Sequence, residues 1–341
     1  MHSLHAPDAA LCELAVDYVM PDDERARLER LFLGLDASPY EDYVGFTAEV
    51  RGLVDRGAVP AGVAGFCQRV RALDRREQPF VLLRNCPIDR DVPIFDFERP
   101  VEHKRACKRT FVAEAFLALY AQLVGTPPIG YANVNDGDVF QDIYPKASMA
   151  DTQSQKALGE IHFHKDLANH FVRPDYVNML SMRADPRNRV YTSFVRNGEA
   201  LERLPDEVVE RLREVEFHTP FDDLTVRSGA VDVGEAPPHA VLTDELDLRF
   251  FEGRTVGLTD RARGAVDRLV AMLHALKARV LLMPGDFLSE HNNFSIHCKE
   301  IVHVHDREAL KTRWIIKTVN VDDLDAHAHR YVPGRYGIVN G

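Results

Sequence analysis

The feature that most constrains the fold is a change in residue patterning near position 130. Before it, charged segments with apolar residues at helical spacing predict amphipathic helices; after it, short runs of β-branched and aromatic residues predict strands. Helices and strands do not alternate as they would in a doubly wound parallel sheet. The sequence therefore predicts an α+β fold around a β core, with a helical first part at residues 1–78 and the core at 79–321.

The expected elements can be stated by their bounds. Helices are expected at 21–33, 43–56, 63–73, 109–124, 204–214 and 258–276. Strands are expected at 79–84, 139–143, 159–164, 176–182, 190–195, 279–287, 294–296 and 312–321. Residues 217–248 are irregular and contain two glycines and three prolines, which is typical of a lid or a long loop near a site.

Composition narrows the classes of protein. With 341 residues, 45% of them hydrophobic, the chain can bury a large core, and we expect one domain spanning 1–341. A net charge of −11 argues against a nucleic-acid partner, because a phosphate-backbone binder needs a basic face. The five cysteines form no CxxC pair, which favours reduced thiols and excludes a zinc ribbon.

The beginning of the sequence lacks a basic segment followed by a long apolar run, so we expect no signal peptide. No stretch approaches the ~18–20 apolar residues that cross a bilayer. We therefore expect a cytoplasmic protein without a membrane partner. The sequence does not indicate an oligomeric state.

The segment 160–166 reads Glu-Ile-His-Phe-His-Lys-Asp. On a strand, residues two apart share a face, so His162, His164 and Asp166 would point the same way. Two histidines and one carboxylate bind one face of an octahedral ion and leave the other face open, as in non-haem Fe(II) sites that activate O₂. A His-x-Asp pair is common by chance, and the pair His162 with His164 is an alternative.

A second segment, at 284–297, supports the prediction of a metal site. A Pro-Gly-Asp turn at 284–286 ends an apolar strand, and His297 follows Asp286 by eleven residues. Arg313 and Trp314 then open a late strand. An arginine near the distal histidine can pair bidentately with the far carboxylate of 2-oxoglutarate.

This order of motifs resembles the clavaminate synthase-like branch of the taurine dioxygenase superfamily, and most of all its amino-acid hydroxylases of peptide-antibiotic pathways. The resemblance covers roughly 79–321 and is strongest in His164-Lys-Asp-Leu-Ala-Asn-His170 and in the following Arg173-Pro-Asp-Tyr176. It implies a double-stranded β-helix (jelly roll) with flanking helices and a lid insert at about 217–257. It also implies Fe(II), 2-oxoglutarate and O₂.

Carried across by this resemblance, the iron ligands would be His164, Asp166 and His297. Arg313 would bind the far carboxylate of 2-oxoglutarate. Thr192, 28 residues after His164, lies where the family keeps a threonine that helps to hold the same carboxylate.

The resemblance also implies contacts to an amino-acid substrate. Lys317, four residues after Arg313, takes the position of an arginine that binds the substrate carboxylate. Ser154 and either Asn133 or Asn135 fall where the family contacts the substrate. Glu252 lies in a region that can bring an acidic side chain to a cationic substrate.

The sequence departs from the family pattern at three places. His-Lys-Asp replaces His-Thr-Glu, Lys317 replaces arginine, and the 16 residues from His297 to Arg313 predict a different loop at 299–311. Because Asp166 is present, halogenation is not expected. The implied reaction is hydroxylation of a free L-amino acid, lysine- or arginine-like or otherwise polar, at C-3 or C-4, with release of succinate and CO₂.

Two other functions fit parts of the sequence. A cupin-type metal dioxygenase or isomerase would share a β-barrel with a His-rich strand, but it usually needs a glutamate a few residues after a His-x-His pair. A non-catalytic barrel that only binds ligands would not need the four residues His164, Asp166, His297 and Arg313 together.

Overall fold

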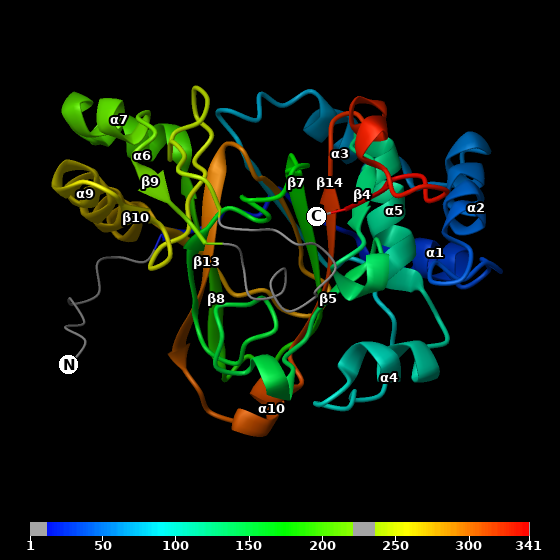
Figure 1. Ribbon diagram of the computed structural model, residues 1–341. Coiled ribbons are helices and arrows are strands. Elements are labelled where there is room, and N and C mark those ends of the chain that lie inside the picture. Colours follow the sequence, from blue (N-terminus) through cyan, green and yellow to red (C-terminus); the bar gives the residue numbers. More distant parts are fainter. Residues whose placement is uncertain (1–11, 221–235, 341) are drawn as a thin grey trace.

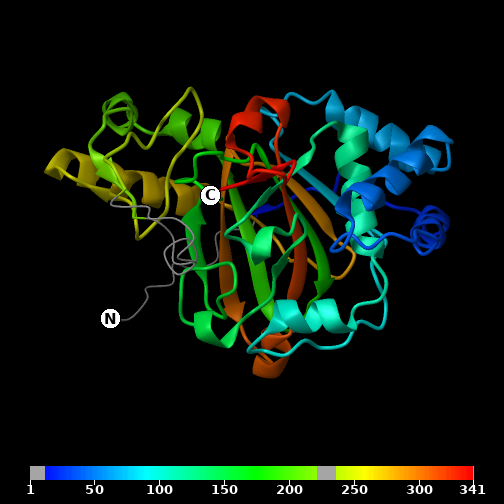
Figure 2. The ribbon, with the colours of Figure 1, turned by 45° about the vertical axis from the view of Figure 1, so that its right-hand side comes forward.

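Two β-sheets lie at the centre of the protein, with helices outside them on both sides (Figures 1 and 2). The computed structural model describes residues 12–220 and 236–340. The α+β class predicted from the sequence is confirmed. Part of the expected lid insert, residues 221–235, lies outside the described residues.

The smaller sheet has five strands in the order β1-β11-β8-β13-β6. All neighbours are antiparallel except the parallel pair of β1 and β11. The strands are β1 (Cys12–Glu13), β6 (Ile161–His164), β8 (Arg189–Arg196), β11 (Ala278–Val280) and β13 (Ser295–His303).

The larger sheet has eight strands, seven of them in the order β15-β4-β14-β7-β12-β3-β2, and β5 pairs with β14. The strands are β2 (Tyr18–Val19), β3 (Phe80–Arg84), β4 (Pro128–Tyr131), β5 (Gln141–Ile143), β7 (Tyr176–Arg183), β12 (Phe287–His291), β14 (Trp314–Asn320) and β15 (Ile338–Val339). A separate antiparallel pair consists of β9 (Phe217–His218) and β10 (Val256–Gly257).

Helices cover the outer face of each sheet. Against the larger sheet pack α1 (Asp22–Phe32), α2 (Tyr43–Asp55), α3 (Ala61–Arg71) and α5 (Val112–Val124). Against the smaller sheet pack α6 (Asn197–Arg203), α7 (Asp206–Leu212) and α9 (Asp260–Leu276). The remaining helices are α4 (Pro100–Cys107), α10 (Arg307–Lys311) and the short η1 (Asn135–Gly137), η2 (Ala147–Met149) and η3 (Asp325–Arg330).

Local chemistry accounts for helix ends. Helix α5 stops at Gly125, whose φ of 85° is left-handed, a conformation that glycine adopts without strain. Helix α9 begins after Thr259, whose hydroxyl accepts a hydrogen bond from the backbone N–H of Ala262 at 3.1 Å.

The alternation of side chains along the strands separates an outer from an inner layer. On β14, Trp314 and Ile316 join the core beneath α5, whereas Ile315 and Val319 join a core between the two sheets. Lys317 shares the parity of these inner residues. The inner core also takes Phe194 from the smaller sheet. Functional side chains of inner parity are therefore held between the sheets.

The sequence located most elements but misplaced some bounds. The helix expected at 204–214 is confirmed as α7, which begins after Pro205, whereas the sequence did not predict α6 directly before it. The strand expected at 279–287 is wrong in its middle: β11 ends at Val280 and β12 begins at Phe287. In the segment 299–311, where the sequence predicted a loop different from that of the family, β13 continues to His303 and α10 follows.

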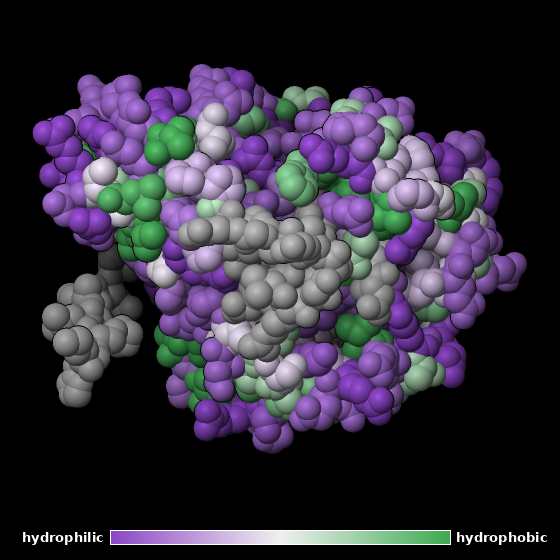
Figure 3. Space-filling model, in the orientation of Figure 1, coloured by the Kyte–Doolittle hydropathy of each residue, from purple (hydrophilic) through white to green (hydrophobic). Residues whose placement is uncertain are grey.

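In the view of Figure 3, hydrophilic residues cover most of the described surface, and the hydrophobic patches are small and scattered. Within residues 12–220 and 236–340, no helix combines the length and the apolar character needed to cross a membrane.

Candidate metal centre

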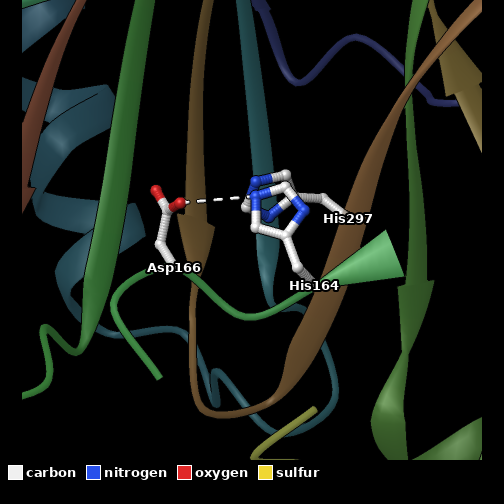
Figure 4. A group of neighbouring side chains, drawn as sticks. All are labelled: His164, Asp166 and His297. Atoms are coloured by element: carbon white, nitrogen blue, oxygen red, sulfur yellow. Dashed lines mark ion pairs between the residues drawn. The ribbon is translucent and has the colours of Figure 1, made fainter. Parts of the chain in front are cut away.

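Three side chains converge between the sheets (Figure 4). His164 ends β6, Asp166 follows it by two residues, and His297 lies on β13. One nitrogen or oxygen atom from each lies within 4.8 Å of those from the other two. The antiparallel pairing of β13 with β6 sets His297 opposite His164, which brings together residues far apart in the sequence.

The outer nitrogen of each histidine faces an oxygen atom. Nδ1 of His164 lies 2.8 Å from the carbonyl oxygen of His162. Nδ1 of His297 lies 2.9 Å from a carboxylate oxygen of Glu290, although the angle is not that of a well-aligned hydrogen bond. Ser295 donates a hydrogen bond of 2.8 Å to the other oxygen of Glu290. Protons held on Nδ1 leave Nε2 free to bind a metal, as in most histidine–metal sites.

Burial and charge set the ionisation of the three groups. Burial and the neighbouring His297 lower the pKa of His164, which favours the neutral, ligating form. Burial alone would raise the pKa of Asp166, but Lys317 holds it well below its usual range. Burial would lower the pKa of His297, but the Glu290 carboxylate outweighs this effect and raises it.

Two cavities meet at this cluster and share His164, Asp166, Lys317 and Gln155. The inner cavity runs between the sheets. Its other lining residues are Ile143, Ile161, Met179, Thr192, His297, Cys298, Lys299, Arg313 and Ile315. The outer cavity opens toward the lid insert. Its other described lining residues are Val134, Gln141, Gln153, Ser154, Lys165, Leu167, Ala168, Asn169, His170, Thr219, Pro220, Phe251 and Arg254.

The inner cavity holds both residues that the sequence predicted for the cosubstrate, Arg313 and Thr192. No hydrogen bond or ion pair of the Arg313 guanidinium is found within the described residues, and burial lowers its pKa to about 10. Lys299 lies in the same cavity, where burial, with Arg313 adding to it, lowers its pKa to about 7. These shifts are typical of buried cations without a counter-ion, so a bound anion would reverse them.

The residues predicted for the substrate are only partly brought together. Ser154 lines the outer cavity, and Lys317 lines both cavities while its ammonium donates to Asp166 at 2.9 Å. Asn133 and Asn135 line neither cavity. Both polar side-chain atoms of Asn133 are buried without a partner in the described structure, and Asn135 accepts a hydrogen bond of 2.6 Å from Lys156.

Glu252 is placed away from both cavities. Its carboxylate lies 2.8 Å from His274 of α9 and accepts a hydrogen bond of 3.1 Å from the backbone N–H of Phe163. His162, the alternative ligand, is exposed and lines neither cavity. Its backbone carbonyl oxygen, rather than its ring, contacts the cluster through Nδ1 of His164. Its place on the strand had suggested a shared face with His164.

Sequence reasoning missed several lining residues. Gln141 pairs directly with Lys317 across β5 and β14, a register that no local pattern reveals. Phe251 stacks on the His164 ring, with ring centroids 5.0 Å apart. Lys299 was detectable, because a residue two positions after His297 on a strand shares its face.

The donor set fits a divalent transition metal. Two imidazoles and one carboxylate bring one donor atom each within 4.8 Å of one another, and a further oxygen or ammonium faces each group from outside the cluster. The cluster lines both cavities, which leaves room for further ligands, as in the facial arrangement of non-haem Fe(II) sites.

Comparison with known proteins points to one group of oxygenases. No family model matches the chain. The chain is 28% identical to clavaminate synthase 2 of Streptomyces clavuligerus over 279 residues, 81% of this chain and 83% of the relative. It is 29% identical to L-asparagine oxygenase of Streptomyces coelicolor over 250 residues, 72% and 71% of the two chains. It is 24% identical to L-lysine 3-hydroxylase of Catenulispora acidiphila over 297 residues, 85% and 80% of the two.

Solved structures share the fold. Asparagine oxygenase in complex with Fe(II), 3-hydroxyasparagine and succinate superposes with a TM-score of 0.78 at 23% identity, covering 95% of this chain and 99% of that one. The non-heme iron oxygenase OrfP in complex with Fe, succinate and (3S)-hydroxy-L-Arg gives a TM-score of 0.78 at 20% identity, with the same coverage.

Proposed function

We propose that the chain is a clavaminate synthase-like Fe(II)/2-oxoglutarate oxygenase and that it hydroxylates a free, polar L-amino acid at C-3 or C-4, releasing succinate and CO₂. The observation that carries the proposal is the cluster of two imidazoles and a carboxylate, which lines both an inner cavity with two cations, Arg313 and Lys299, and an outer cavity with many polar side chains. We further propose one domain over 1–341, a double-stranded β-helix for the paired sheets, and a lid at about 217–257.

His164, Asp166 and His297 would hold the iron. Bound there, Fe(II) supplies the oxidising chemistry with 2-oxoglutarate and O₂. The side chains of the protein then contribute by orienting the metal ligands and by excluding water. The carbonyl of His162 and the carboxylate of Glu290 orient the two rings, and a site between two packed sheets excludes bulk water.

The inner cavity would take 2-oxoglutarate. Its far carboxylate needs a cation and hydrogen-bond donors, and Arg313 and Thr192, which line the inner but not the outer cavity, would supply these. The absence of a partner for the Arg313 guanidinium within the described residues supports this role, because a buried charge without a counter-ion is costly.

The outer cavity would take the amino acid. Lys317 lines both cavities and would present an ammonium with more than one donor to a substrate carboxylate, and Ser154 also lines the outer cavity. Apart from Asp166, the polar side chains of the described lining are amides, hydroxyls and basic groups. This lining supports a polar amino acid. Because the Glu252 carboxylate faces His274, we do not propose that it binds the cationic side chain of a substrate.

The test is succinate release from 2-oxoglutarate by the Fe(II)-loaded protein across the free L-amino acids. We expect one or a few polar amino acids to stimulate release and to gain the mass of one oxygen atom, and Asp166→Ala to abolish both. Wild-type succinate release by Asp166→Ala would contradict the proposal. Equal oxygen uptake without 2-oxoglutarate would instead favour a cupin-type dioxygenase.

A further inference from the structure

The inner cavity contains a second cation besides Arg313. Lys299 lies on β13, two residues after His297, and lines the same cavity as Arg313 and Thr192. In the pairing of β13 with β8, Lys299 is directly opposite Thr192, just as His297 is opposite Phe194. Residues paired in this way have their Cα atoms about 4.5–5.5 Å apart. The backbone register therefore places Lys299 beside the threonine predicted to contact the cosubstrate.

Lys299 has no acidic partner at ion-pair distance within the described residues. Its ammonium donates a hydrogen bond of 2.8 Å to the carbonyl oxygen of Ala157, a neutral acceptor. The acidic group that influences it electrostatically, Glu160, accepts a hydrogen bond from the backbone N–H of Ile301 at 3.0 Å. The side chain of Lys299 thus keeps donor capacity, because an ammonium has three N–H groups.

Among the described residues, some other buried lysines, unlike Lys299, have a carboxylate partner. Buried Lys104 and Lys108 each lie within 2.8 Å of a carboxylate, and buried Lys317 lies 2.9 Å from Asp166. Burial without such a partner is expensive for a charged group. Two cations that share a cavity without a counter-ion in the described residues, Lys299 and Arg313, therefore indicate a ligand with a full negative charge in that cavity.

We propose that Lys299 is a second cationic contact, beside Arg313, for the far carboxylate of 2-oxoglutarate, and that it sets the preference for a dicarboxylic over a monocarboxylic 2-oxo acid. This inference rests on the proposed function. The carboxylate has two oxygens and several lone pairs, enough for a guanidinium, a hydroxyl and an ammonium together. Lys299 is a positioning residue, since it lies at the end of the cosubstrate remote from the reacting atoms.

The test compares two ligands that differ only in the far carboxylate, 2-oxoglutarate and 2-oxopentanoate. Their affinities for the Fe(II)-loaded protein are measured by calorimetry without O₂. The measured quantity is the ratio of the two affinities, so a loss common to both ligands does not count as an effect on the carboxylate. Lys299→Met removes the charge, Lys299→Arg keeps it, and Lys311→Met, on exposed helix α10, is the matched control.

We expect Lys299→Met to lower the ratio about 10-fold or more, the effect of losing one hydrogen bond between charged groups. Lys299→Arg and Lys311→Met should keep it within about threefold of wild type. An unchanged ratio in Lys299→Met, or an equal loss of affinity for both ligands, overturns the role of Lys299. If the wild-type protein still binds 2-oxoglutarate, the proposed function is unaffected by that result. Failure of the wild-type protein to bind 2-oxoglutarate overturns both.

Discussion

Replacing Glu290 by glutamine tests whether the carboxylate beside His297 strengthens metal binding by that histidine. Glu290 is fully buried on β12, and one of its oxygens lies 2.9 Å from Nδ1 of His297. Glutamine has nearly the same shape but carries no charge, and its amide can present an N–H group to the ring. His297 would then carry its proton on Nε2, the nitrogen needed for the metal. Loss of such an outer partner typically weakens metal binding about 10- to 100-fold, or about 1.4–2.8 kcal/mol.

The assay is a competitive Fe(II) titration of wild type, Glu290→Gln and a matched control. Glu300→Gln is that control, because Glu300 lies on β13 but pairs with Lys277 and Arg279 and lines neither cavity. We expect the control to change the Fe(II) dissociation constant by less than about threefold. An unchanged constant in Glu290→Gln, or an equal change in both variants, would refute the reasoning.

Three further changes have expected outcomes. Lys317→Met should weaken Fe(II) binding most at low pH, because losing the ammonium raises the pKa of Asp166 and lets protons compete with the metal; titrations at about pH 5.5 and about pH 7.5 measure this. Burial lowers the pKa of His291 to about 3, so below about pH 6.5 the unfolded chain takes up a proton that the folded chain does not. The free energy of unfolding therefore falls by up to ~1.4 kcal/mol per pH unit as the pH falls. Denaturant melts at about pH 7 and about pH 5 should show a smaller fall in His291→Leu than in the wild type. Trp314→Phe should lower the free energy of unfolding by ~1–3 kcal/mol in the same melts, because the buried carboxylate of Asp142 loses the indole N–H that donates to it at 2.9 Å. A Lys317→Met site with wild-type affinity at low pH, a His291→Leu protein with an unchanged pH slope, or a Trp314→Phe protein as stable as wild type would each contradict its prediction.

Local periodicity made much of the fold predictable. The spacing of apolar residues located α1, α2, α3, α5 and α9, since a helix that buries one face must repeat it every turn. Strand parity also indicated a side-chain cluster at 162–166. Parity could not separate His162 from His164 in function, because the turn after β6 and the pairing with β13 decide which ring faces the cavity.

Contacts set by long-range register were beyond local patterns. Gln141 reaches Lys317 only through the pairing of β5 with β14, and the role expected of Glu252 depended on which way the chain turns at Gly253, whose φ is 79°. That turn leaves the carboxylate facing His274. The pairing of Asp166 with Lys317 joins two of the departures from the family pattern, a relation that only the structure reveals.

The most direct test of the account is the stoichiometry and affinity of Fe(II) binding in four single variants. His164→Ala, Asp166→Ala and His297→Ala remove the clustered donors, and His162→Ala removes a neighbouring histidine whose ring is exposed. We predict one Fe(II) per chain in the wild type and in His162→Ala, with affinity reduced at least about 100-fold in each of the other three. Tight binding that survives loss of His297, or that is lost with His162, would contradict the proposed centre.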